Sequence, residues 1–319
     1  MPGLGEPCDF LAPLFVYGLL QPGELAYPLI ADYVTEAVPG TVSGSLRVRD
    51  GLPLLDPRLS GQVQGHLLLP KPPNAADLWK AVANFEPGSQ YRYAAVAVDI
   101  EGTPVRANVL VGRQVRRGTA PETTDRWSAA RDPVFVEGLA EVLTMTMDVA
   151  PKGVEVQPDR PDLWRQFFRL QAAYLLLWAV VERYTALRYG PALDPHERVG
   201  RLDRDEAFQA AVVDVGAIED EVFDSRDPDA KYRLRQDGSG AAKYFYGVRS
   251  NLSHRGKSAF HDGRLLFKAL VELHDAIRLV LADQVPSLVD AWQPLNNDGG
   301  WLLRQLLPEN AVVVRSRPG

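Results

Sequence analysis

The sequence predicts an α+β protein with a strand-rich first part and a helical second part. From residue 14 to residue 115, apolar residues form short runs separated by Pro, Gly and Asp, a pattern typical of strands joined by turns. From residue 161 onward, apolar residues recur at alternating steps of three and four, as in amphipathic helices. The chain has 319 residues, too many for one ordinary hydrophobic core, so we expect two domains.

The first part contains the expected strands and one helix. The strands are predicted from apolar runs at residues 14–17, 42–48, 63–69, 94–100 and 105–111. The helix is expected over residues 74–82, where Asn74 can cap its first turn. We therefore predict a first domain over residues 1–118.

Residues 119–160 are interpreted as a connector. The wider segment 116–162 is rich in Pro, Arg, Asp and Thr, and its apolar stretch 134–147 indicates one further helix or strand.

The second part is expected to be a helical bundle over residues 161–298. Its four helices are predicted from the apolar stripes Phe167–Tyr184, Phe208–Val222, Ala241–Val248 and Leu266–Leu281. Four amphipathic helices are enough to enclose a bundle core. In the tail, residues 299–319, Ala311–Val314 has the composition of a terminal strand.

Composition limits the classes of partner. A net charge of −6 argues against nucleic-acid binding over the whole surface, although a local basic patch stays possible. The single cysteine, Cys8, allows no disulfide within the chain, which fits a reducing compartment. The most apolar run, 172–181, is far shorter than the roughly 20 residues of a membrane span. We expect a cytoplasmic protein that does not enter a membrane.

The loop after the first expected strand, Tyr17-Gly18-Leu19-Leu20-Gln21-Pro22-Gly23, is the first candidate site. Glycines at its two ends permit backbone conformations and close approaches that a side chain would prevent. Consecutive N–H groups in such a loop can form a concave site for a carboxylate or phosphate. The alternative is an ordinary turn that follows a strand.

Glu86 is the second candidate. It lies between the expected helix and a strand, in a segment that contains Phe85, Tyr91 and Tyr93. Aromatic surroundings desolvate a carboxylate and raise its pKa towards the range of a general base. The alternative is a surface glutamate beside a turn.

Together these segments resemble the gamma-glutamylcyclotransferase-like family, whose first strand ends in Tyr-Gly-Ser/Thr-Leu-x-x-Gly. Four segments carry the resemblance, namely Tyr17–Gly23, Gly44–Leu55, Val63–Leu67 and Glu86–Arg92. There are two departures: Leu19 stands in place of Ser or Thr, and Pro87 separates Glu86 from Gly88.

The resemblance implies a mixed β-barrel with flanking helices that cyclises a γ-glutamyl amine to 5-oxoproline and releases the amine. Glu86 would be the general base. The substrate would be held by Tyr17, Gly18, Leu19, Leu20 and Gly23, with Tyr91 or Tyr93 lining the pocket. No cofactor is implied.

The helical part contains Arg249-Ser250-Asn251-Leu252-Ser253-His254. This segment resembles the Arg-x(4–6)-His motif of the HEPN superfamily, whose ribonucleases act as metal-independent dimers. The resemblance implies Arg249 and His254 as catalytic residues and Asn251 as a polar residue of the RNA site, with Glu182 as a nearby acid. The positive charges of Arg255 and Lys257 make them candidate contacts to the RNA backbone. On a regular helix, however, residues five apart are separated by about 140°, so the helix must break or two chains must share the site.

Three hypotheses remain open at this point. The chain is a cyclotransferase-like enzyme acting through Glu86 on a small γ-glutamyl compound, with the helical part serving assembly or RNA binding. Alternatively, the helical part is an endoribonuclease in a toxin or defence role, and the barrel senses a ligand. Thirdly, both parts are non-catalytic binding modules. A homodimer is expected, and the scattered histidines predict no metal site.

Overall fold

The computed structural model describes residues 3–115, 117–149, 161–217, 219–224, 227, 229–255 and 263–292. The chain forms two compact units. Unit 1 contains Met1–Asp132 together with Tyr184–Asp194, and unit 2 contains Pro133–Arg183 together with Pro195–Gly319. The predicted connector therefore includes a helix of unit 2, and a short later segment returns to unit 1.

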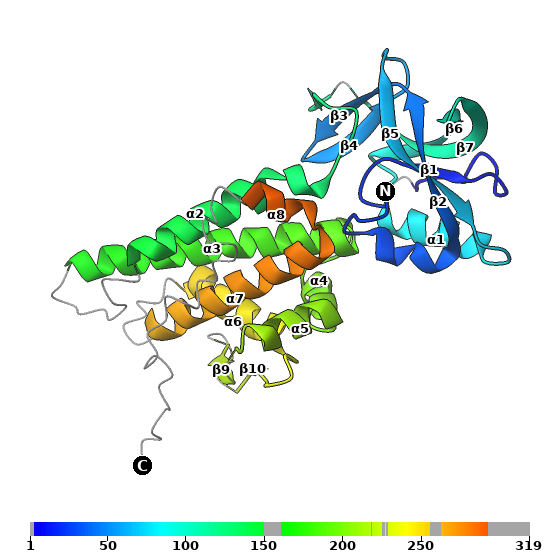
Figure 1. Ribbon diagram of the computed structural model, residues 1–319. Coiled ribbons are helices and arrows are strands. Elements are labelled where there is room, and N and C mark those ends of the chain that lie inside the picture. The colour runs from blue at the N-terminus through cyan, green and yellow to red at the C-terminus, as the bar shows by residue number, and fades with distance from the viewer. Residues whose placement is uncertain are drawn as a thin grey trace. The chain divides into compact units, whose positions relative to one another are not determined.

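Unit 1 is built on a closed barrel (Figure 1). Its strands are β1 (Leu14–Val16), β2 (Val34–Ser43), β5 (Gln62–Pro70), β6 (Tyr91–Ile100) and β7 (Thr103–Gly112). They follow the order β1-β5-β2-β6-β7, and parallel pairing of β1 with β7 closes the barrel. All three residues of β1 are buried, so this strand runs through the core and delivers the loop that follows it to the interior.

A smaller sheet lies beside the barrel in unit 1. It has the order β4-β3-β8, with β3 at Ser45–Arg49, β4 at Leu52–Asp56 and β8 at Ala120–Pro121. Asp50 and Gly51 join β3 to β4, and both have positive φ values of 53° and 75°. That combination is the one required by the tight turns of β-hairpins. The predicted strand 42–48 is thus two elements, the end of β2 and most of β3.

Helix α1 (Ala75–Phe85) packs on unit 1 through a buried face of Leu78, Trp79, Val82 and Phe85. The prediction of a helix here was correct but three residues too short. Asn74 occupies the N-cap position, yet its side chain makes no capping hydrogen bond.

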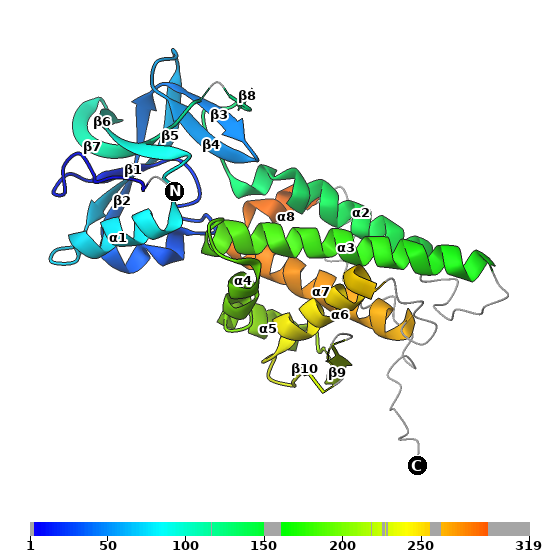
Figure 2. The same cartoon turned by 180° about the vertical axis from the view of Figure 1, so that it is seen from behind.

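Unit 2 is mostly helical. Its helices are α2 (Pro133–Val149), α3 (Pro161–Tyr189), α4 (Pro195–Leu202), α5 (Glu206–Asp214), α6 (Ala241–Arg255), α7 (Gly263–Gln284) and α8 (Ser287–Trp292). Helix α3 belongs to unit 2 as far as Arg183, and its last residues belong to unit 1. Figure 2 shows α2, α3 and α7 running alongside one another. Two buried hydrogen bonds join helices: Tyr174 Oη donates to Phe245 O at 2.9 Å, and Trp292 Nε1 donates to Phe135 O at 3.2 Å.

The second predicted helix, over 208–222, was wrong at its C-terminal end. Helix α5 ends at Asp214, and Asp220–Phe223 forms strand β9, which pairs with β10 (Lys231–Leu234). Gly216, at a φ of 60°, directs the chain out of the helix. The predicted strand at Ala311–Val314 lies outside the described residues.

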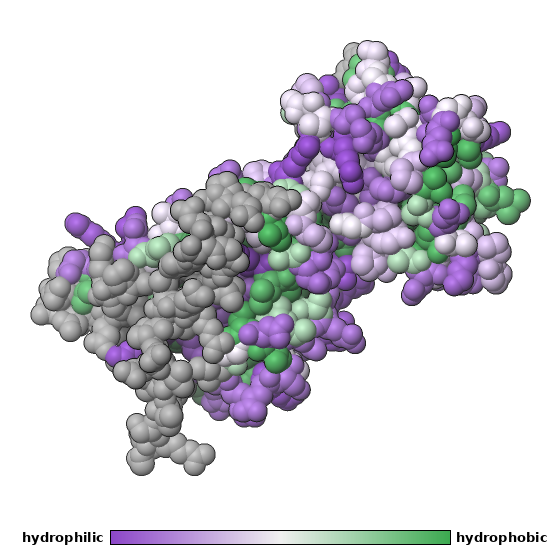
Figure 3. Space-filling view, in the orientation of Figure 1, coloured by the Kyte–Doolittle hydropathy of each residue, from purple (hydrophilic) through white to green (hydrophobic). Residues whose placement is uncertain are grey.

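Large apolar side chains are exposed at several places on the described surface. Figure 3 shows polar and apolar residues interspersed on unit 1, where the segment before β1 leaves Phe10 and Leu11 exposed. Among the helices of the described ranges, none combines the length and the apolar character needed to cross a bilayer.

Candidate active site

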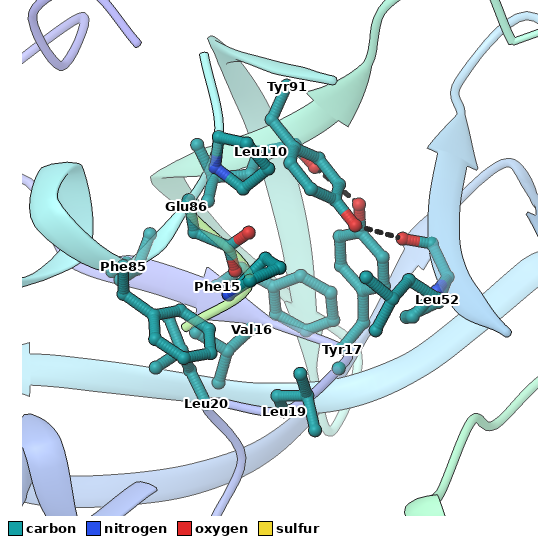
Figure 4. A pocket seen from close by; sticks show the side chains of 15 residues that line it. Phe15, Val16, Tyr17, Leu19, Leu20, Leu52, Phe85, Glu86, Tyr91 and Leu110 are labelled. Atoms are coloured by element: carbon teal, nitrogen blue, oxygen red, sulfur yellow. Dashed lines mark hydrogen bonds between the residues drawn. The ribbon is translucent and has the colours of Figure 1, made fainter. Parts of the chain in front are cut away.

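A pocket within unit 1 is lined by six of the eight candidate residues of the barrel (Figure 4). The end of β1 and the following loop form one wall, and Leu52, Pro53 and Leu110 contribute from β4 and β7. Phe85, Glu86 and Pro87 enter from the end of α1, and Tyr91 enters from β6. Pro191, from the returning segment 184–194 of the same unit, completes the lining.

Gly18 allows the loop to pass close to β4. A Cβ atom at this position would lie 3.0 Å from Pro53 Cγ, which is tighter than about nine in ten real Cβ contacts, so Pro53 would have to shift. The neighbouring Tyr17 hydroxyl donates to Leu110 O at 2.6 Å and accepts from Leu55 N–H at 3.0 Å. The Tyr17 side chain, which directly follows β1, therefore links the main chains of β7 and β4. Burial raises the pKa of Tyr17 well above its usual value.

Glu86 is placed by the end of α1. It is the C-cap residue, its N–H donates to Val82 O at 2.9 Å, and its backbone is already extended. Pro87 then accepts hydrogen bonds from the N–H groups of Gln90 and Tyr91, which forms the turn into β6. The extra residue between Glu86 and Gly88 is thus absorbed in this turn.

The carboxyl group of Glu86 points into the pocket (Figure 4). Burial raises the pKa of Glu86 to about 8. Among the described residues, none donates a hydrogen bond to this carboxyl group or forms an ion pair with it. No such interaction therefore stabilises the charged form against its loss of hydration. Near neutral pH the group is therefore largely protonated.

Gly18, Leu19 and Leu20 line the same pocket, and each carries a main-chain N–H group. Within the part of the chain that the structure describes, no group accepts a hydrogen bond from them. Gly23, at a φ of 80°, lies in the subsequent turn and does not line the pocket. Only the first half of the predicted loop therefore borders the acid.

The two tyrosines of β6 differ in role. Tyr91 lines the pocket, and its hydroxyl donates to Pro53 O at 2.9 Å. Tyr93 does not line it and stacks edge to face on Trp79, with ring centroids 5.8 Å apart. Burial, and secondarily the charge of Glu86, raises the pKa of both phenols.

The pocket is small and mostly apolar. Its volume is about 40 Å³, whereas one water molecule occupies about 30 Å³ in the liquid. Leu19, Leu20, Leu52 and Phe85 are all buried around it. Pro191 is exposed, so it lies at the rim.

Several walls of this pocket were not predicted. Phe85 continues the helical spacing of Leu78 and Val82, so extending the predicted helix by three residues would have placed Phe85 on its buried face. Pro53 and Pro191 carry no local signal of their role. They are 33 and 105 positions from Glu86 in the sequence, and only the fold brings them to it.

A second cavity in unit 1, of about 440 Å³, is more open and has a mixed polar and apolar lining. It is lined by residues that include His66, Asp99 and Arg126, and it shares no lining residue with the pocket around Glu86. Gln21 is buried beneath it, with Oε1 3.2 Å from His66 Nδ1. We assign the chemistry to the smaller pocket because it contains a desolvated acid.

The candidates of the helical part lie in unit 2. Arg249 is 3.9 Å from Glu182, which also accepts a hydrogen bond from Trp178 Nε1 at 2.9 Å. Asn251 Nδ2 donates to Phe223 O at 2.8 Å. Helix α6 continues to Arg255 without the break near Ser250 to Ser253 that would bring Arg249 and His254 together. Lys257 lies outside the described residues.

No metal site is apparent in the described ranges. There, no three His, Cys, Asp or Glu side chains lie close enough together to hold an ion.

Comparison with known proteins concerns the barrel. Residues 14–129 match the model of a family described as gamma-glutamyl cyclotransferase, AIG2-like. This range includes all five barrel strands, α1 and Glu86. The crystal structure of an AIG2-like protein from Mus musculus is 19% identical over 38% of this chain and 90% of that chain, with a TM-score of 0.30. The comparison with curated proteins gave no match.

Proposed function

Because residues 14–129 are similar to the AIG2-like gamma-glutamyl cyclotransferase family, we propose that unit 1 is a cyclotransferase-like enzyme. Its substrate is a small γ-glutamyl amine, and its general base is Glu86. The observation that carries the proposal is an unpaired carboxyl group, with its pKa raised to about 8, in a pocket lined by Gly18, Leu19 and Leu20. The main-chain N–H groups of these three residues have no acceptor among the described residues.

The reaction needs one proton acceptor that also returns the proton. The Glu86 carboxylate takes a proton from the α-ammonium group of the substrate, and the neutral amine attacks its own γ-carbonyl carbon. A C–N bond closes the five-membered ring. The bond to the leaving amine then breaks as its nitrogen takes the proton from Glu86. The ring nitrogen still carries one extra proton, which Glu86 accepts and passes to the released amine. The products are therefore the neutral lactam ring of 5-oxoproline and an ammonium ion. The attack is intramolecular, so orientation in the pocket supplies much of the acceleration.

The substrate carboxylate is assigned to the loop after β1. Three consecutive main-chain donors suit a carboxylate, and they do not depend on the hydroxyl that Leu19 lacks. An ammonium group beside Glu86 lowers the pKa of the acid, because an opposite charge favours ionisation. Substrate binding therefore generates the base that the reaction uses.

The proposal requires the pocket to widen. A volume of about 40 Å³ cannot enclose a γ-glutamyl group, so side chains of the wall must shift on binding. Leu19 is the side chain at the position where the family has Ser or Thr, and we expect Leu19→Ala to lower KM by enlarging the pocket. An unchanged or higher KM would contradict this part of the proposal.

The test is the formation of 5-oxoproline, measured by mass spectrometry with γ-glutamyl amino acids and γ-glutamyl alkylamines as substrates. We expect Glu86→Gln to lower kcat by about 100-fold or more, the usual contribution of a general base. Glu36→Gln is the matched control, because Glu36 is exposed on β2. Failure of the wild-type chain to turn over any member of the series, or full activity of Glu86→Gln, would refute the proposal.

The dependence of the rate on pH gives a second test. Free Glu86 has a pKa of about 8, and only its ionised form accepts the proton. We therefore expect kcat/KM to rise with pH up to about 8 and then to level off. A rate that is constant from pH 5 to 8 would exclude Glu86 as the base.

A second candidate function belongs to unit 2. The contact between Arg249 and Glu182 places an acid beside the arginine of the HEPN-like motif. Because α6 is unbroken, metal-independent RNA cleavage by Arg249 and His254 would require two chains to share the site. Cleavage in the presence of a chelator, lost in His254→Ala, would support this function.

A further inference from the structure

Helix α3 has a second apolar stripe, which is exposed. The buried stripe faces the core of unit 2 and includes Phe167, Leu170, Tyr174, Leu177 and Val181. The other stripe also advances by alternating steps of three and four and consists of Arg165, Phe168, Ala172, Leu175, Ala179 and Glu182. All six are exposed, with Phe168 at 58% and Leu175 at 40%. We call this set the α3 outer stripe.

The outer stripe is open to a partner. In the view of Figure 2, no other helix lies in front of the middle of α3. Single exposed apolar residues are common, but a row at this spacing is the pattern of a helix-pairing seam. The stripe belongs wholly to the part of α3 in unit 2.

The six positions are symmetric about the point midway between Ala173 and Tyr174. A second α3 can pack against the first in antiparallel orientation, with the two-fold axis passing through this midpoint. Each residue of the stripe then faces a residue of complementary size or charge on the other helix. Phe168 faces Ala179 of the partner subunit, and Ala172 faces Leu175 of the partner subunit. Large side chains thus oppose small ones, which lets two helices approach closely.

The two ends of the stripe are complementary in charge. Arg165 faces Glu182 of the partner subunit in this arrangement, and the two-fold axis repeats the pair at the other end. Arg165 makes no ion pair within the described part of the chain. The Glu182 side chain stays 47% exposed despite its contacts with Arg249 and Trp178. A parallel pairing would instead place like charges together.

We propose that the α3 outer stripe is a self-association surface, and that its partner is a second copy of this chain packed antiparallel on the same stripe. The interface is isologous, because the same patch serves both copies. It extends towards α2, where Met147 is 42% exposed and Asp148 pairs with Arg169 at 3.0 Å. The proposal is independent of the chemistry at Glu86.

The first test is the mass of the full chain by sedimentation equilibrium over a concentration series. We expect a dimer for the wild type. Leu175→Glu should raise the dissociation constant by at least about thirtyfold, the effect of losing a central interface residue. Val213→Glu is the matched control, since Val213 is 46% exposed on α5 and lies outside the stripe. A monomeric wild type, or a Leu175→Glu variant that dimerises normally, would overturn the proposal.

The second test fixes the orientation. Arg165→Glu and Glu182→Arg should each weaken the dimer by about five- to tenfold, because each places like charges together. The double variant restores the opposite-charge pairs only in the antiparallel arrangement, so its dissociation constant should return to within about twofold of the wild type. Additive weakening in the double variant would overturn the antiparallel pairing.

Discussion

At the residue scale, the raised pKa of Glu86 has a consequence for stability. In the unfolded chain its pKa returns to about 4.5, whereas in the folded protein it is about 8. As pH rises through this window, the unfolded state loses a proton that the folded state keeps. The folded state therefore loses stability, by at most about 1.4 kcal/mol per pH unit.

We therefore predict that Glu86→Gln stabilises the protein above pH 4.5. Glutamine does not titrate, so the variant and the wild type should differ little at pH 4.5, and the variant should be more stable by about 2–4 kcal/mol at pH 8. Urea unfolding at several pH values measures the difference. Glu36→Gln should show no such divergence, and parallel pH profiles for Glu86→Gln and the wild type would contradict the burial of this acid.

Glu86 and the loop after β1 could be selected as candidates from sequence because their signals are local. A glycine beside an apolar run and a carboxylate between a helix and a strand are visible without the fold. The small size of the pocket was not visible, because Phe85, Pro53 and Pro191 reach it from separate elements. The departure at Leu19 was visible, and this residue lines the pocket.

At the element scale, the sequence was most informative where apolar residues form uninterrupted runs. The runs at 14–17, 63–69, 94–100 and 105–111 correspond to β1, β5, β6 and β7. Strand β2 was missed before residue 42 because it is partly exposed along its length and contains Pro39 and Gly40. Its pairing with β5 and β6, not its composition, makes it a strand.

The Tyr17 hydroxyl supports a prediction at the same scale. Tyr17→Phe removes a group that bonds to the main chain of both β7 and β4. It leaves a buried carbonyl and a buried N–H unsatisfied, which should cost about 2–3 kcal/mol of unfolding free energy. Chemical denaturation measures the loss. Tyr33→Phe is the control, because the Tyr33 hydroxyl makes no hydrogen bond to a described residue, and an equal effect of both variants would argue against this role.

At the scale of the whole molecule, the α+β class is confirmed. Residues 14–129 are similar to the AIG2-like family, whereas the likeness of the helical part to HEPN proteins stays a prediction. Composition alone could not show that residues 184–194 belong to unit 1. The contacts between residues 184–194 and the rest of unit 1 join residues that are far apart in the sequence. Arg188 Nη1 donates to Leu25 O at 2.7 Å, and Gly190 lies against Phe85.

A fragment of residues 1–132 tests the role of the returning segment. Without Gly190 and Pro191, the last turn of α1 loses packing next to Phe85 and Glu86. We predict that hydrogen exchange of the amides from Val82 to Glu86 is faster in the fragment than in the whole chain, because local opening becomes less costly. The β6–β7 hairpin, which does not line the pocket from Ala94 to Ala107, is the internal control and should exchange alike in both. Equal protection of α1 in the two proteins would show that unit 1 is complete without residues 184–194.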